Sequence, residues 1–116
     1  MKDDRLFLIH ILECIGRISE YTKDGKSAFM SAGMIQDAVL RNLHTLTESA
    51  QRLSDALKAR HPEVDWQGLS GFRNVLVHDY LGVDVERVWE IMERQLGGLK
   101  RRIEAILQEL GDPRST

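Results

Sequence analysis

The feature that most constrains this chain is a hydrophobic repeat of three and four residues, which runs along most of its length. In an α-helix this spacing places apolar side chains on one stripe, whereas a half-buried strand requires alternation, which no segment sustains. Two prolines and nine glycines in 116 residues are too few for a linker-rich protein, and 42% apolar residues are too many for a disordered one. The sequence therefore predicts an all-α fold.

The first half of the chain predicts two helices. One extends from the acidic residues at positions 3 and 4 to the turn at Gly25, and its apolar stripe is Leu8, Ile11, Leu12, Ile15 and Ile18. After a short connection, a second stripe of about six turns runs through residues 35–57. Ser27 or Ser31 is the expected cap of this helix, and Pro62 closes it.

Two further helices are predicted to begin at Asp65 and Asp84, whose carboxylates can accept from free first-turn amides. The last helix carries an apolar stripe from Val88 to Leu110 and ends at Gly111. Both starts have an apolar pair that brackets the cap, a pattern that fixes the chain entry. These pairs are Val64 with Leu69 and Val83 with Val88.

Four amphipathic helices joined by short connections must bury their stripes together, so we expect an antiparallel four-helix bundle. A chain of this size buries roughly two thirds of its unfolded surface, which is enough for one core. Residues 1–116 are therefore expected to form one domain.

Charge and cysteine content narrow the function classes. The formal net charge of −2 is unlike that of domains that bind nucleic acid with their whole surface, although a local basic site remains compatible with it. Cys14 is the single cysteine, which fits a reducing compartment, and the apolar run LFLIHIL is too short and polar to be a secretory or membrane segment. We expect a cytoplasmic protein. The four histidines fall on different predicted elements without metal-ligand spacing, so no metal or cofactor is expected.

The third helix is unusual for a structural element. It contains two interior glycines, each costing ~1 kcal/mol relative to alanine, which could permit close approach of another helix, a substrate or a second subunit. A polar cluster follows within eight residues. The glycines are Gly68 and Gly71, and the cluster is Arg73, Asn74, His78, Asp79 and Tyr80.

Arg73 and His78 suit phosphodiester cleavage if they converge. They are about 140° apart on an ideal helix, so they meet only through the long arginine side chain or if the helix ends before Gly82. The guanidinium can hold a phosphate, and an imidazole with a pKa of about 6.5 can move a proton. No metal is needed when the nucleophile is the 2′-hydroxyl of RNA. Alternatively, His78 only favours a helix dipole and Tyr80 is a core-edge aromatic.

The segment RNVLVHDY at 73–80 closely resembles the RX4HXY motif of the HepT family, which comprises minimal HEPN-domain toxins paired with MntA-type nucleotidyltransferase antitoxins. The likeness extends over almost the whole chain. In the same order it includes AVLRNL at 38–43, Glu48, Ala50, RLS at 52–54, the HP and W of HPEVDW, and GVDVERVW at 82–89. The stretch NLHTLTESAQ departs from the family, whose members more often have an Ile-Gly-Glu-Ala-like sequence there.

The resemblance implies a homodimeric helical bundle that acts as a metal-independent endoribonuclease on RNA, with Arg73 and His78 near a cleft between subunits. Asn74 fits the polar residue that often follows the arginine of the motif. In that family, the tyrosine at the position of Tyr80 is the AMPylation target of the partner nucleotidyltransferase, so the resemblance implies the same role for Tyr80. Asp79 and Glu48, which matches a family acid, are expected accessory residues. The alternatives are a non-catalytic helical module that docks a nucleotidyltransferase or a nucleotide, and a purely structural dimer.

Two other polar groups have open interpretations. The basic residues 100–102 could guide RNA, but consecutive residues spread around a helix and are typical of ordinary surface charge. A polar ridge on the second helix is either solvated or faces a subunit. Its members are Arg41, His44, Glu48 and Arg52.

Overall fold

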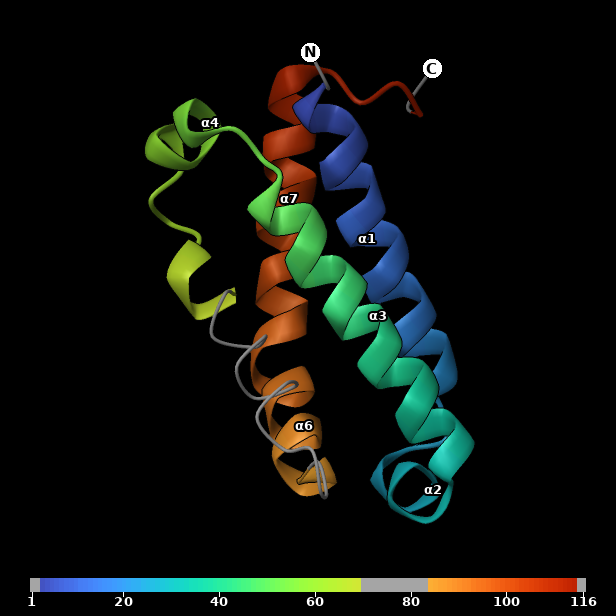
Figure 1. The fold of residues 1–116 in the computed structure, drawn as a ribbon. Helices are drawn as coiled ribbons and strands as arrows, with labels where there is room; N and C mark the ends of the chain where they lie inside the picture. The colour runs from blue at the N-terminus through green and yellow to red at the C-terminus, as the bar shows by residue number, and fades with distance from the viewer. Residues whose placement is uncertain (1–2, 70–83, 115–116) are drawn as a thin grey trace.

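The computed structural model describes residues 3–69 and 84–114. Every element in this part of the chain is helical (Figure 1), which confirms the predicted all-α class and the HEPN-like bundle. The elements are α1 (Asp4–Tyr21), α2 (Lys26–Ser31), α3 (Gly33–Gln51), α4 (Asp55–Arg60), α6 (Val85–Ile91), the π-helical turn η1 (Met92–Leu96) and α7 (Gly97–Leu110).

Helix α1 lies at the centre of the packing, because it contacts both α3 and α7. Figure 1 shows α1 running opposite to these two helices, so its start lies beside their ends. Helix α2 closes the other end of the bundle against α3 and α6. The predicted stripes form the core, whose fully buried members include Leu8, Ile11, Ile18, Val39, Leu43, Leu46, Ile103 and Ile106.

The predicted second helix is wrong in one respect, since it is two helices with a break after Gln51. Ser54 starts α4 because its hydroxyl oxygen accepts from the backbone N–H of Leu57 at 3.2 Å. Its own N–H and O–H donate to the carboxylate of Asp4, at 2.9 and 2.6 Å. Leu53 and Leu57 are both buried despite the break, so the apolar stripe continues across it.

The connection before α3 also differs from the prediction, because it contains the short helix α2. Ser27 and Ser31 do not cap α3; the hydroxyl of Ser31 instead donates to the carbonyl of Ser27 at 3.1 Å, a bond available inside a helix. The start of α3 follows Ala32, which has no capping side chain. The amide of Gln36 reaches back and donates to the carbonyl of Phe29 at 2.9 Å, which ties α2 to α3.

The two aspartate caps are confirmed. Asp65 accepts from the N–H of Gly68 at 2.8 Å, and Asp84 accepts from the N–H of Arg87 at 3.2 Å. Val64 and Leu69, the predicted apolar pair around the first cap, are both buried. Val83, from the second pair, lies outside the described residues.

The final helix begins at Val85 and ends at Leu110, as predicted, but it includes the π-helical turn η1. At the α6 end, the ring of Trp89 packs on Phe29 of α2 with centroids 5.3 Å apart. Beyond η1, the stripe of α7 faces α1. The helix thus joins two contact surfaces, one on α2 and one on α1.

Candidate functional site

The predicted site residues Arg73, Asn74, His78, Asp79 and Tyr80, together with Gly71, lie outside the described residues. The structure describes the chain on either side of the segment 70–83, and we call these two flanking stretches its supports. The first support is the chain that ends at Leu69, and the second begins at Asp84, the cap of α6.

Gly68 has a local structural role in the first support. A Cβ atom at this position would collide with the side-chain carboxylate of Asp65, which is held in place by its bond to the N–H of Gly68. Glycine at this position therefore leaves room for the carboxylate of the cap. The close approach of another helix, a substrate or a second subunit at Gly68 stays a prediction.

Leu69 packs into a shallow cavity of about 50 Å³ against η1 and α7. Of the basic residues 100–102, Arg102 lines this cavity, whereas Arg101 extends toward Gly97. All three are exposed. Arg102 is thus the member of this group that shares a cavity with Leu69, the last described residue before the segment 70–83. The lining consists of Val64, Asp65, Leu69, Gln95, Leu99 and Arg102.

His61 anchors the chain that leads into this support, a role that the sequence interpretation missed. Its ring is buried, with Nδ1 2.8 Å from Oε1 of Glu63 and Nε2 3.8 Å from Oε2 of Glu109. The carbonyl of His61 accepts from the indole N–H of Trp66 at 3.0 Å. A hydrogen bond from its own backbone and one from His61 lower the pKa of Glu63. The HP and W of the family-like segment HPEVDW therefore include two residues that bond to each other.

Glu48, the predicted accessory acid, lies on α3 and pairs with Nε2 of His44 at 2.9 Å. It lines a cavity of about 160 Å³ between α1 and α3, and not the cavity at Leu69. Glu48 and Leu69 thus line different cavities. We name this the α1–α3 cavity, and its lining residues are Phe7, His10, Thr45, Glu48, Ser49 and Arg52.

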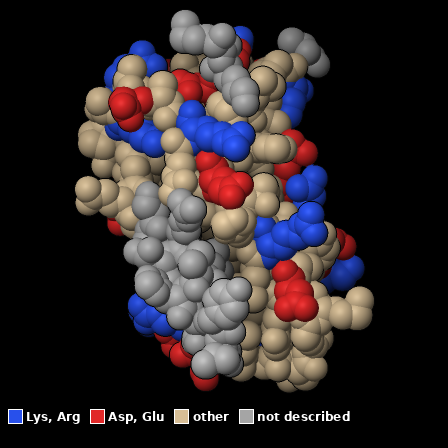
Figure 2. All heavy atoms as spheres, viewed as in Figure 1, with Lys and Arg blue, Asp and Glu red and all other residues tan. Residues whose placement is uncertain are grey.

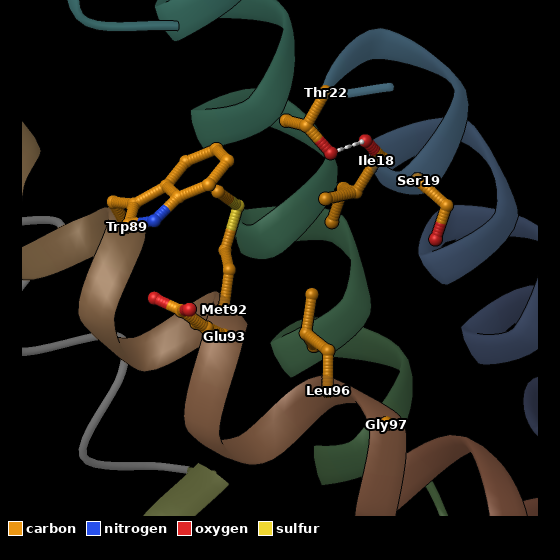
Figure 3. Close-up of a pocket in the computed structure, with 8 residues that line it drawn as sticks. All are labelled: Ile18, Ser19, Thr22, Trp89, Met92, Glu93, Leu96 and Gly97. Atoms are coloured by element: carbon orange, nitrogen blue, oxygen red, sulfur yellow. Dashed lines mark hydrogen bonds between the residues drawn. The ribbon is translucent and has the colours of Figure 1, made fainter. Parts of the chain in front are cut away.

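A third cavity, of about 200 Å³, lies where η1 passes the end of α1 (Figure 3). Its wall is largely apolar, with the carboxylate of Glu93 as its charged group. The hydroxyl of Thr22 donates to the carbonyl of Ile18 at 2.7 Å. None of the predicted site residues lines this cavity. The cavity was not predicted from the sequence, because hydrophobic spacing does not reveal the π-helical turn that forms part of its wall. Its lining is Ile18, Ser19, Thr22, Trp89, Met92, Glu93, Leu96 and Gly97.

The remaining described surface has mixed charge. Figure 2 shows basic and acidic side chains interspersed on the face in view, without a large area of one sign. Cys14 is completely buried, and burial raises the pKa of its thiol. Residues 3–69 and 84–114 contain no group of three His, Cys, Asp or Glu side chains placed to hold a metal ion. No helix in these ranges is both long and apolar enough to cross a membrane.

Comparison with known families decides the relationship. The sequence pattern of the ribonuclease HepT-like family matches residues 11–106, which include the motif segment and most of the described helices on both sides of it. The chain belongs to the ribonuclease HepT-like family. It is accordingly placed among endoribonucleases of the HEPN superfamily, which confirms the resemblance seen in the sequence.

Individual HepT-like relatives agree with this assignment. A Methanocaldococcus jannaschii protein with the provisional name RNase is 31% identical over 106 residues, which are 90% of this chain and 97% of that protein. A Thermococcus cleftensis protein named a probable ribonuclease HepT is 31% identical over 101 residues, covering 86% of this chain and 92% of its own.

A third relative is longer than this chain. It is an M. jannaschii protein named as a gamma-glutamylcyclotransferase and provisional RNase, and it is 34% identical over 110 residues, which are 94% of this chain. The chain spans about half the length of that protein. No solved structure shows a significant match.

Proposed function

We propose that this chain is a metal-independent endoribonuclease toxin in which Arg73 and His78 carry the chemistry. Arg73 binds the scissile phosphate of RNA and stabilises the charge that develops there. His78 is the general acid or base. Asn74 and Asp79 orient these two groups, and Glu48, on α3, is an accessory acid.

The proposed step balances without a metal or a cofactor. The 2′-oxygen of the ribose forms a bond to phosphorus while the bond from phosphorus to the 5′-oxygen breaks. A base takes the proton of the 2′-hydroxyl and an acid gives a proton to the leaving 5′-oxygen, and His78 performs one of these transfers. The products are a 2′,3′-cyclic phosphate end and a 5′-hydroxyl end.

Regulation is proposed to act on the same segment. A partner MntA-type nucleotidyltransferase transfers AMP from ATP to the hydroxyl oxygen of Tyr80, with release of pyrophosphate and of the phenolic proton. The transfer adds a phosphate and bulk two residues after His78. The added phosphate can pair with Arg73 and exclude RNA by charge and volume. The toxin is proposed to act in the cytoplasm. Each chain forms one domain of residues 1–116, and two chains form a homodimer whose active-site cleft is shared between the subunits.

The observation that carries this proposal is the family match over residues 11–106, within which the whole segment Arg73–Tyr80 falls. The two aspartate caps support it. Asp65 and Asp84 define helix starts on either side of the segment, so both of its ends are attached to ordered helices.

The test is cleavage of RNA by the purified protein in EDTA, with product ends identified by mass. We expect cyclic phosphate ends from the wild type and none from Arg73→Ala or His78→Ala, with little change in melting temperature. Cleavage by His78→Ala at the wild-type rate would remove His78 from the mechanism. RNA binding without cleavage by the wild type would favour the non-catalytic module.

The homodimer has its own test. Sedimentation at micromolar concentration should give twice the chain mass, whereas a monomer there would reject a cleft shared between subunits.

A further inference from the structure

We infer that the α1–α3 cavity is a nucleotide subsite, which holds one nucleotide of the RNA in addition to the contacts proposed for Arg73 and His78. This inference rests on the proposed function for the identity of the polymer.

The walls come from two helices that pack directly on each other. Helix α1 contributes Phe7 and His10, which are three residues apart and share a face. Helix α3 and its C-cap contribute positions 45, 48, 49 and 52, which also follow the spacing of one helical face. The groups are therefore held on two rigid elements that converge on about 160 Å³ of space.

The cavity offers a site for a phosphate. Arg52 follows the last residue of α3 and is exposed, and no ion pair or side-chain hydrogen bond involves it within the described residues. The same is true of the exposed ring of His10. A guanidinium with open donors beside an imidazole is suited to a phosphate. One carboxylate oxygen of Glu48 is already engaged by Nε2 of His44 at 2.9 Å.

The other groups of the cavity match the rest of a nucleotide. The half-buried ring of Phe7 provides a surface on which a base can stack. The hydroxyl of Thr45 donates to the carbonyl of Arg41 at 3.0 Å. Its oxygen can therefore still accept a hydrogen bond from a donor group of the nucleotide. Glu48 is a second acceptor for a ribose hydroxyl or an exocyclic amine. Inorganic phosphate would contact only Arg52 and His10 and would leave the other groups of the cavity unused.

The cavity continues into a more open groove along the exposed side of α1, because Phe7 and His10 line both. The groove has about 440 Å³ of space and a mainly apolar wall, in which Leu6 is 62% exposed. A chain that places one nucleotide in the cavity therefore has a path for its neighbour. This continuity favours a segment of a polymer as the natural occupant. The remaining groove residues are Ile9 and Glu13.

The decisive experiment is a titration of the isotope-labelled full chain with AMP and, separately, with inorganic phosphate, followed by amide NMR. We expect AMP to shift the signals of Phe7, His10, Thr45 and Ser49, and phosphate to bind at least tenfold more weakly. Arg52→Ala should weaken AMP binding about tenfold. Arg60→Ala, an exposed arginine of α4 outside the cavity, should leave it unchanged.

Two results would overturn the subsite. One is AMP shifts that avoid these four residues or that persist at full affinity in Arg52→Ala. The other is equal affinity for phosphate and AMP, which would reduce the cavity to a general anion site. Because AMP binding does not require RNA cleavage, a wild type that fails to cleave RNA would reject the proposed function while this titration still decides the subsite. With active enzyme, Arg52→Ala should raise KM about tenfold and change kcat less than twofold.

Discussion

The carboxylate of Asp4 accepts hydrogen bonds from both the backbone N–H and the hydroxyl of Ser54, at 2.9 and 2.6 Å. Because the same hydroxyl oxygen accepts from the N–H of Leu57, Ser54 connects the start of α1 to the first turn of α4. One side chain therefore fixes the place where the predicted long helix divides.

Removing this connection should destabilise the fold. Asp4→Ala and Ser54→Ala are each expected to lower the free energy of unfolding by about 1–2 kcal/mol, since each loses hydrogen bonds at a helix cap. The double variant should lose less than the sum of the two, because both substitutions remove the same bonds. Urea unfolding measures this, with the exposed Asp37→Ala as control. Full additivity would show that the two residues act independently.

Glycine substitutions should have opposite effects at two helical positions. Gly68→Ala should destabilise the protein by about 1 kcal/mol or more, because the new Cβ collides with the Asp65 carboxylate and displaces the cap. Gly16→Ala in α1 has open space around it and should stabilise by about 0.5–1 kcal/mol. Thermal unfolding of both variants measures the difference. Stabilisation by Gly68→Ala would show that the cap tolerates the methyl group.

Acid should weaken the anchor at His61. The pKa of Glu63 is lowered from its ordinary 4.5, so its contribution is present above that value and is lost as pH falls through the folded pKa. Glu63→Gln should therefore flatten the decline of stability below about pH 4.5. Chemical unfolding across pH 3–7 tests this prediction, with the exposed Glu104→Gln as matched control. Identical acid profiles for Glu63→Gln and the wild type would exclude the contribution.

Tyr80→Phe should separate modification from catalysis. Co-expressed with the partner nucleotidyltransferase, the variant should carry no AMP and keep RNA cleavage, whereas the wild type should carry AMP and lose it. Intact mass and the cleavage assay measure the two properties. If Tyr80 is only a core-edge aromatic, Phe should cause a modest stability loss and leave the modification unchanged. A full adduct on the Phe variant would place the acceptor elsewhere.

The fold was predictable where local patterns determine it. The stripes of α1 and α7 are buried as their spacing indicates, and Asp65 and Asp84 cap as their positions indicate. The break before Ser54 was not predictable, because the apolar stripe continues across it through Leu53 and Leu57 and the deciding contact comes from Asp4, 50 residues away.

The candidate site was predictable to a different extent. Arg73 and His78 were identified from their chemistry, their spacing and the family resemblance, and their roles stay predictions. His61 was missed because its importance depends on Glu63 and Glu109 reaching it in space. The sequence placed Arg52 only in a polar ridge of one helix. Its cavity was not predicted, because it forms where α1 and α3 pack together, and helical spacing within one helix does not show this.

The π-helical turn at Met92–Leu96 gives the last helix one place where its length can change. Such a turn holds one more residue than an α-helical turn, so deleting a residue there would restore regular winding. Because the wider turn already absorbs the extra residue, α6 would keep nearly the same rotation relative to α7. Trp89 would then stay on the face that packs on Phe29. A deletion within α6 or α7 would instead rotate all residues on one side of it by about 100°, so a one-residue deletion should be tolerated better at η1 than elsewhere in this helix.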